Sequence, residues 1–168
     1  NAGGRMSTSI LAMRLFFSKS RDEAENILDE LITYNNERKK ATEDAVGKIV
    51  SELGDDAENS NVIIKYIPDC HESVAGIAAG RVKDIYHRPV IVLTDSSDEN
   101  SIKGSARSVE GFDIFERIMT CRDLLSRFGG HPMAAGLTLE KKNFDEFVRR
   151  MNEPGWPEGA DKFKRIVI

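Results

Sequence analysis

A segment of eight residues, Gly129 to Gly136, carries the pattern with the clearest chemical meaning in this sequence. It reads Gly-Gly-His-Pro-Met-Ala-Ala-Gly, so three glycines and two alanines surround one histidine. Because these residues leave almost no side-chain bulk, a ligand can lie against bare backbone amides while the His131 imidazole supplies a directed contact. The pattern indicates a phosphate or nucleotide pocket. A structural interpretation is equally open: a helix that ends at Gly129, a tight turn at His131 and Pro132, and a strip of small packing residues.

Polar residues alternate along a second segment, which contains Lys103, Ser105 and Arg107. Because successive side chains of an extended strand point to opposite faces, all three leave the same face. An ammonium, a hydroxyl and a guanidinium that converge there would bind a phosphate, and the guanidinium can do so through two hydrogen bonds. Gly104 and Ala106 keep the opposite face small. The structural alternative is a solvated sheet edge that carries ordinary surface charges.

Two further side chains are candidates for contact with a ligand. Arg127 precedes the glycine segment and is a second candidate phosphate partner, or else a cation that caps the C-terminus of a helix. His71 lies where a predicted strand meets a predicted helix, and a structural role for it is as open as a functional one. His71-Glu72 also begins the zinc-protease pattern His-Glu-x-x-His, but Ala75 replaces the second histidine, so that pattern fails.

Four segments, in this order along the chain, resemble a known family. Residues 128–136 resemble the Gly-Gly-His-x-Met-Ala-Ala-Gly signature of the accessory domain of DHH-superfamily phosphoesterases. Their sequence is most similar to the form of this signature in the RecJ-like exonucleases. Residues 1–6 resemble the family's Asn-Ala-Ala-Gly-Arg segment, and residues 71–81 its His-Pro-Gly-Val-x-Gly-Ile-x-Ala-x-Arg segment. Residues 103–108 resemble its Lys-Gly-Ser-Gly-Arg-Ser segment. The resemblance therefore covers nearly the whole chain.

The sequence departs from the family pattern at a few positions. Cys70 stands where tryptophan is common, and Glu72-Ser73 replaces Pro-Gly. Ala106 replaces the usual glycine, which argues against a required positive φ at that position.

The resemblance implies roles for a set of residues. The candidate substrate-binding and phosphate-binding residues are Lys103, Ser105, Arg107, Ser108, Gly129, Gly130 and His131. The candidate residues at the rim of an active site are Asn1, Arg5, His71 and Arg127.

The chemistry of the family depends on residues that this sequence lacks. DHH-family enzymes hydrolyse phosphodiesters with two divalent metals held by aspartates and histidines, including an Asp-His-His motif. That tripeptide does not occur here, the three histidines are far apart, and Cys70 and Cys121 form no Cys-x-x-Cys pair. We therefore expect no catalytic residue and no metal ligand in this chain. The resemblance implies that Mg²⁺ or Mn²⁺ is bound by a catalytic DHH domain outside it.

The resemblance implies the substrate-binding part of a 5′→3′ single-stranded-DNA exonuclease that acts in DNA repair and recombination. The implied partners are single-stranded DNA, the missing catalytic DHH domain and a C-terminal oligonucleotide-binding domain. One alternative is a DHH-family oligoribonuclease or cyclic-dinucleotide phosphodiesterase, which the long predicted helix and the continuation past Pro157 disfavour. Another is a non-catalytic nucleic-acid-binding module like that of alanyl-tRNA synthetases. The Gly-Gly-His-Pro-Met sequence disfavours this alternative, because it fits the RecJ-like family better.

Composition restricts the class of protein. The 168 residues are 40% hydrophobic and 31% charged, as in a globular domain. No apolar run approaches the roughly 20 residues of a membrane span, and no signal-peptide pattern is present, so we expect a cytoplasmic protein. The net charge of −4 argues against nucleic-acid binding, but residues 1–60 hold 8 basic and 12 acidic residues while the remainder is balanced. Any basic face must therefore arise from local arrangement.

These residues need a scaffold, and the hydrophobic pattern predicts one. The sequence begins without an initiator methionine, so we expect a piece of a longer protein. The resemblance implies that residues 1–19 are the end of the catalytic DHH domain, and the hydrophobic pattern predicts a connecting helix over residues 20–54. By the same resemblance, residues 61–153 are expected to form the DHH-associated substrate-binding domain, and residues 154–168 a linker and the start of a following domain.

The connecting helix follows from local signals. Residues 7–17 read as a short apolar helix with Ile10, Leu11, Leu15 and Phe16 on one face. Ser20 and Glu23 then form a capping box, and apolar residues at helical spacing continue to Leu53, with Gly54 as a natural C-terminal stop. A single helix of that extent would be about 50 Å long. Two shorter helices that break near Asn35 are the alternative.

The remaining pattern is α/β. Strands are predicted at residues 62–67, 89–94, 102–107 and 137–139, and the first two enclose a helical stripe from Val74 to Ile85 as a β-α-β unit. Further helices are predicted from Asp113 to Phe128 and from Phe144 to Met151. The predicted fold class is therefore α/β: a mixed sheet flanked by helices and preceded by a long connecting helix.

Overall fold

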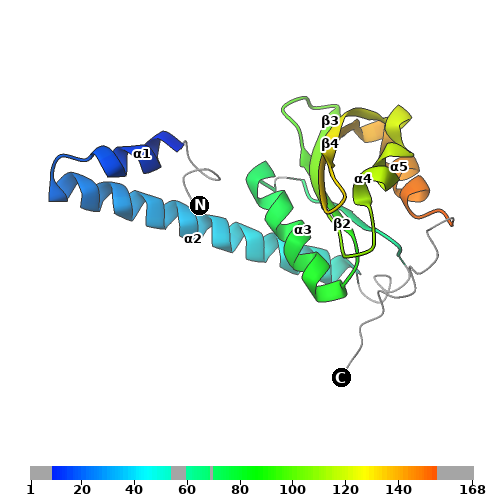
Figure 1. The fold of residues 1–168 in the computed structure, drawn as a ribbon, viewed down its shortest axis with the longest axis horizontal. Helices are drawn as coiled ribbons and strands as arrows, with labels where there is room; N and C mark the ends of the chain where they lie inside the picture. Colours follow the sequence, from blue (N-terminus) through cyan, green and yellow to red (C-terminus); the bar gives the residue numbers. More distant parts are fainter. Residues whose placement is uncertain (1–8, 54–59, 69, 155–168) are drawn as a thin grey trace, which may run out of the picture. The chain divides into compact units, whose positions relative to one another are not determined.

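The computed structural model describes residues 9–53, 60–68 and 70–154 (Figure 1). The candidate rim residues Asn1 and Arg5 lie outside the described residues. The chain divides into two compact units, residues 1–44 and 45–168. Among the helices of the described ranges, none is long and apolar enough to cross a membrane.

The first unit contains helix α1, Ser9–Phe17, and most of helix α2, Arg21–Leu53. The predicted capping box forms where α2 begins: the Glu23 N–H donates to Ser20 Oγ at 3.2 Å, and the Glu23 carboxylate accepts from the Lys19 N–H at 3.1 Å. Helix α2 continues through Asn35 without a break. The prediction of one long helix is confirmed, and the two-helix alternative is wrong.

The apolar face predicted for the short first helix is only partly buried. Leu11 is buried, whereas Ile10 and Phe16 are 62% and 86% exposed. Met13 and Phe17 are exposed as well. The spacing of apolar residues therefore predicted the helix correctly but did not predict how little of this face is buried.

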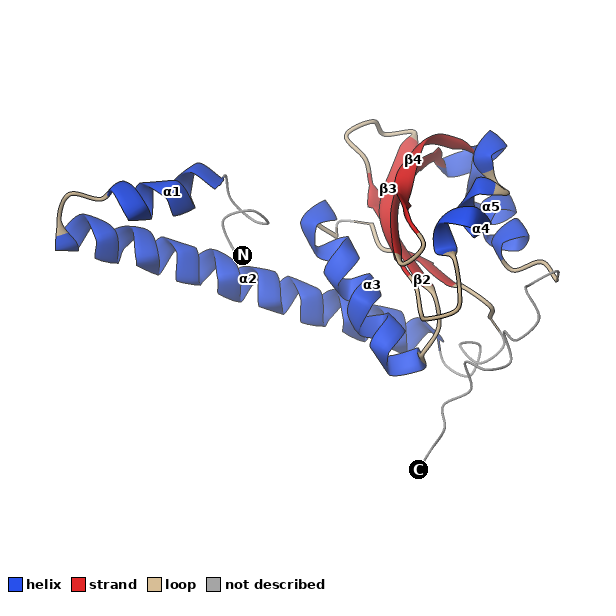
Figure 2. Cartoon of the chain, viewed as in Figure 1, coloured by secondary structure: helices blue, strands red, loops and turns tan. Residues whose placement is uncertain are grey.

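The second unit is built on a five-stranded mixed sheet in the order β1-β2-β3-β5-β4 (Figure 2). Its strands are β1 (Ile63–Tyr66), β2 (Val90–Asp95), β3 (Ser101–Arg107), β4 (Leu125–His131) and β5 (Ala134–Glu140). Strands β1 and β2 run parallel and are connected through helix α3 (Glu72–Tyr86), and all other neighbours are antiparallel. The predicted β-α-β unit and α/β class are confirmed.

Both faces of the sheet carry hydrophobic cores, which explains the continuous apolar run of β2. Ile91 and Leu93 pack toward helices α4 (Ile114–Met119) and α5 (Phe144–Met151). Val90 and Val92 pack on the other face against α3 and Ile49 of α2. Figure 2 shows α3 on one side of the sheet and α4 and α5 on the other. A central strand that is buried on both faces cannot show the alternation of a half-exposed strand.

The helix predicted from Asp113 to Phe128 begins where expected, with Asp113 as its N-cap, but its predicted second half is wrong. Helix α4 ends at Met119, a 3-10 turn spans Arg122–Leu124, and strand β4 begins at Leu125. Strand β4 forms a hairpin with β5 whose loop is Pro132-Met133, so the predicted tight turn is present but follows a strand and not a helix. At Gly130 a Cβ would lie 2.4 Å from the Ala134 carbonyl oxygen, so the hairpin requires a residue without a side chain there.

Strand β3 shows why small residues were expected between its polar ones. Ala106 is fully buried. Its φ is not positive, because among the described non-glycine residues only His87 has a positive φ. This agrees with the expectation from alanine at position 106, where the family has glycine. Gly104 lies against β2, where a Cβ would be 2.3 Å from the Val92 carbonyl oxygen. The two positions therefore limit side-chain size on the face of the sheet that packs against α4 and α5.

Candidate substrate-binding site

The register of strands β3, β5 and β4 brings the two candidate segments together. Residues that are paired across neighbouring strands project from the same face of a sheet. The pairing produces three rows on the face that Lys103 shares with Ser105 and Arg107, which we call the pocket face. These rows are Lys103, Thr138 and Arg127; Ser105, Gly136 and Gly129; and Arg107, Ala134 and His131.

A bulge in β4 directs the third strand's polar residues to this face. Leu125 pairs with Leu139 and Arg127 pairs with Thr138, so the register shifts by one residue at Ser126. Leu125 and Phe128 both pack against the core beneath α4, and Arg127 then faces the opposite side with Gly129 and His131. In an unbulged strand, Arg127 would share the face of Leu125, toward the core. The bulge is therefore a positioning element of the site.

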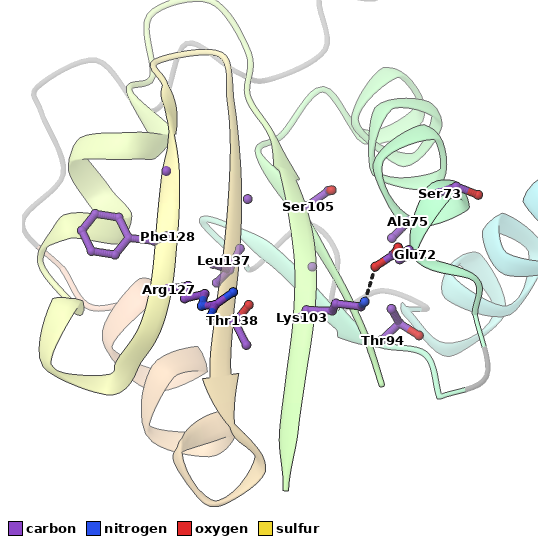
Figure 3. Close-up of a pocket in the computed structure, with 13 residues that line it drawn as sticks. Glu72, Ser73, Ala75, Thr94, Lys103, Ser105, Arg127, Phe128, Leu137 and Thr138 are labelled. Atoms are coloured by element: carbon purple, nitrogen blue, oxygen red, sulfur yellow. Dashed lines mark ion pairs between the residues drawn. The ribbon is translucent and has the colours of Figure 1, made fainter. Parts of the chain in front are cut away.

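A pocket of about 570 Å³ lies on the pocket face, beside the first turn of α3 (Figure 3). Helix α3 packs over β2 and β3, and the pocket lies where the surface of β5 and β4 continues beyond the helix. The lining residues are Glu72, Ser73, Ala75, Thr94, Lys103, Gly104, Ser105, Arg127, Phe128, Gly129, Gly136, Leu137 and Thr138.

The middle row provides a floor without side chains. Gly129 and Gly136 pair with each other and are both exposed, and we call them the glycine floor. A Cβ at Gly129 would meet nothing within 4 Å, so packing does not require glycine at that position. What glycine gives there is access, because a ligand can approach the backbone directly between the polar side chains of the neighbouring row.

The charges of the pocket come from three residues. Lys103 and Arg127 are basic, and Glu72 is the one acidic residue among the thirteen that line the pocket. Glu72 forms an ion pair with Lys103, drawn as a dashed line in Figure 3. The hydrogen bond from the Lys103 ammonium, with its charge, lowers the pKa of the Glu72 carboxyl, so this group is ionised at neutral pH.

Arg107 lies next to the pocket without lining it. Its Nη1 donates to the Ala106 carbonyl oxygen at 2.7 Å, and its guanidinium lies against Gly76 of α3. A Cβ at Gly76 would be 2.7 Å from Nη2 of Arg107 and 3.3 Å from Oγ of Ser105. Gly76 therefore makes the space in which the Arg107 guanidinium lies beside the helix.

Ser108, Gly130 and His71 lie outside the pocket lining and make contacts within the fold. Ser108 is buried, and its hydroxyl donates to the Phe112 carbonyl oxygen at 2.6 Å. Gly130 permits the close approach within the hairpin described above. His71 is the N-cap of α3, where its Nδ1 accepts from the Ser73 N–H at 3.2 Å.

His131 is exposed at the end of β4, in the same row as Arg107. Its Nδ1 accepts a long hydrogen bond of 3.4 Å from the Met133 N–H across the hairpin turn. Of the candidates predicted from sequence, Lys103, Ser105, Gly129 and Arg127 are brought together in the pocket. Glu72, Ser73, Thr94 and Thr138 were not predicted, because their approach depends on strand register and on the first turn of α3.

Thr94 fixes the entry to α3. Its side chain is buried, and its hydroxyl donates to the Cys70 carbonyl oxygen at 2.5 Å, immediately before the His71 cap. Burial raises the pKa of the Cys70 thiol, so the thiol remains protonated at neutral pH. The hydrogen bond from Thr94 and the His71 cap thus fix where α3 begins. Glu72 and Ser73, which follow the cap, therefore line the pocket beside Lys103.

The described residues do not fit the two-metal site that the family resemblance implies. Within the described ranges, no three His, Cys, Asp or Glu side chains lie close enough together to hold a metal ion. The pocket lining contains one carboxylate, and that carboxylate is paired with a lysine. The chemistry that this face can perform is the binding and orientation of an anionic group.

Comparison with known proteins identifies the family of this chain. The family model of the DHHA1 domain matches residues 59–154. The single-stranded-DNA-specific exonuclease RecJ of Bacillus subtilis (strain 168) is 35% identical over 153 residues, which cover 91% of this chain and 20% of that protein. RecJ of Escherichia coli (strain K12) is 34% identical over 162 residues, which cover 91% of this chain and 28% of that protein. The chain thus spans about a fifth to just over a quarter of these relatives.

Solved structures give the same result. RecJ from Thermus thermophilus in complex with Mg²⁺ is similar with a TM-score of 0.79 and 29% identity, over 90% of this chain and 23% of that one. A structure of exonuclease RecJ bound to manganese has a TM-score of 0.80 and 30% identity, over 90% and 37% of the two chains. In fold and in sequence, the chain belongs to the DHHA1 domain family and is a RecJ-like member of the DHH superfamily.

Proposed function

We propose that the pocket face holds the phosphates of single-stranded DNA as the substrate-binding part of a RecJ-like 5′→3′ exonuclease. The observation that carries the proposal is the register of β3, β5 and β4, which gathers Lys103, Ser105 and Arg127 around the glycine floor. The names of the RecJ relatives support the substrate class, because each is a single-stranded-DNA-specific exonuclease. A role in DNA repair and recombination, and a location in the cytoplasm, belong to the same proposal.

The contribution of this face to catalysis would be positional. Phosphate contacts fix the register and orientation of a nucleic-acid strand but do not read its sequence. Lys103 and Arg127 would neutralise phosphate charge, and the glycine floor would let the backbone amides approach the strand. His131 would donate to a phosphate oxygen or a base edge. Holding the strand in this way brings the scissile bond to a separate catalytic centre and lowers the entropic cost of the reaction.

The proposed domain organisation follows the same reasoning. Residues 1–19 would end a catalytic DHH domain that binds Mg²⁺ or Mn²⁺, and residues 20–54 would connect it to the binding domain of residues 61–153. Residues 154–168 would lead into an oligonucleotide-binding domain. The chain alone would then be inactive, and its function would be measured in the full-length protein.

The proposal is tested by the kinetics of the full-length protein on a long single strand. Arg127→Ala should raise KM about tenfold with kcat nearly unchanged, because it removes binding that the ground state and the transition state share. The matched control is Arg122→Ala, which removes an exposed arginine outside the pocket lining. An unchanged KM would refute the phosphate-binding role. Faster degradation of a dinucleotide than of the long strand would favour the oligoribonuclease alternative instead.

A further inference from the structure

Glu72 is placed where an incoming phosphate would bind. Its carboxylate comes from the first turn of α3 and pairs with the ammonium of Lys103, the cation of the pocket's first row. Both side chains line the pocket, and they remain partly open to solvent, with 60% of Glu72 and 32% of Lys103 exposed. The ion pair therefore lies at the mouth of the site and can be reached by a ligand.

The position of this carboxylate is fixed by the fold. The His71 cap and the hydrogen bond from Thr94 to Cys70 set where α3 begins, so Glu72 projects from an ordered first turn. The positive end of the helix dipole also favours a negative charge in the first turn. The carboxylate thus has two independent reasons to stay ionised and in place, the helix terminus and the lysine.

We infer that Glu72 is an internal competitor that occupies Lys103 until a phosphate of the ligand displaces it, and that it weakens phosphate binding in the pocket. This inference rests on the proposed phosphate-binding function of the pocket face. A carboxylate and a phosphate oxygen bind an ammonium group in the same way, so the two compete for Lys103.

The competition affects every ligand that uses Lys103. A nucleoside monophosphate and a strand must each break the Glu72–Lys103 pair to place a phosphate on Lys103, so each loses the free energy of that ion pair. A strand would also contact Arg127 in the same row and Arg107 and His131 in the third row, and these contacts keep its total affinity higher. Glu72 therefore weakens the binding of both ligands by a similar factor.

The test compares the affinities of full-length variants in EDTA, so that the strand is bound without being cut. Glu72→Gln should bind a single-stranded oligonucleotide roughly two- to fivefold more tightly, the range that corresponds to the coupling of exposed ion pairs. Its slope of log K against log salt should stay close to that of wild type, because Lys103 contacts a strand phosphate in both complexes once Glu72 is displaced. The affinity for a deoxynucleoside 5′-monophosphate should increase by a similar factor, because the same competing carboxylate is removed for both ligands.

Two variants separate competition from a general effect of charge. Glu116→Gln removes the same charge from the first turn of α4, on the opposite face of the sheet, and should leave both affinities unchanged. Glu72→Asp keeps the charge but shortens the side chain that reaches Lys103, so it should bind the strand more tightly than wild type. Unchanged or weaker binding by Glu72→Gln, or equal gains in Glu116→Gln, would overturn the inference. If Arg127→Ala also leaves binding unchanged, the proposed function itself fails.

Discussion

At the scale of single residues, the glycines of β3 and β4 have different roles that substitution can separate. Gly104 faces the backbone of β2, where a Cβ would contact the Val92 carbonyl oxygen at 2.3 Å and the Leu93 Cα at 2.9 Å. Gly129 has open space where its Cβ would be and lines the pocket. Gly104 therefore serves the packing of the sheet, and Gly129 serves access to it.

Gly104→Ala should destabilise the fold by about 3 kcal/mol, because the added methyl group is forced against backbone atoms that cannot rotate away. Denaturant unfolding of the full-length protein, with the transition of this domain followed separately, measures the change in the free energy of unfolding. A loss of less than about 0.5 kcal/mol would show that β2 and β3 are farther apart than described.

Gly129→Ala should leave stability nearly unchanged but weaken binding of single-stranded DNA. The methyl group fits without a clash, so the free energy of unfolding should stay within about 0.5 kcal/mol of wild type. Binding of single-stranded DNA should weaken, because the methyl group covers the backbone on the glycine floor. Wild-type affinity in an oligonucleotide titration would show that no ligand approaches the floor closely.

At the scale of elements, the sequence predicted most of the scaffold but not the strand that completes the site. The capping box, the long helix and the β-α-β unit follow from local signals and were confirmed. The start of strand β4 was predicted as helix because Leu124 and Leu125 continue the apolar pattern of Ile114, Phe115 and Ile118. The bulge at Ser126 determines which face Arg127 takes, and bulges leave no reliable signal in a single sequence.

The part of the site that lies on one strand was predictable from the sequence, and the part that depends on contacts between elements was not. The alternation of Lys103, Ser105 and Arg107 on β3 was read correctly from the sequence, because a regular strand has a period of two. The approach of Arg127 to Lys103 depends on two antiparallel pairings, and the approach of Glu72 depends on where α3 begins. Contacts of this kind are set by tertiary structure and have no local pattern.

Helix α5 carries an ion-pair network whose pH dependence can be measured. Glu146 accepts from Arg149 at 2.7 and 2.8 Å and from Arg150 at 2.9 Å, which lowers the pKa of its carboxyl to about 2. Arg150 also donates to both oxygens of Asp123 and lowers the pKa of that carboxyl. The network links α5 to the turn before β4.

Because these pKa values are lower in the folded state, the stabilisation is present above the usual carboxyl pKa of about 4.5 and is lost as the pH falls toward 2. Glu146→Gln should therefore show a smaller drop in Tm between pH 5 and pH 2.5 than wild type. Asp145→Asn, an exposed neighbour on the same helix, is the control. Equal acid-induced drops in all three proteins would contradict the role of Glu146 in acid stability.

At the scale of the whole molecule, the sheet of the second unit packs helices on both faces and leaves part of one face open for binding. One face is covered by α4 and α5. The other is covered by α3 over β2 and β3, and the pocket lies where β5 and β4 extend past that helix. The chain has an acidic net charge of −4, but basic residues meet on this one face because three strands place them in register.

The central claim is that the pocket face binds a strand as one continuous surface across β3 and β4. It is tested most directly by salt titration of single-stranded DNA binding by full-length Arg107→Ala, Arg127→Ala and the double variant. Each arginine should account for about 0.7 of the slope of log K against log salt, so the double variant should lose about 1.4. A slope that is unchanged in the double variant would contradict the claim.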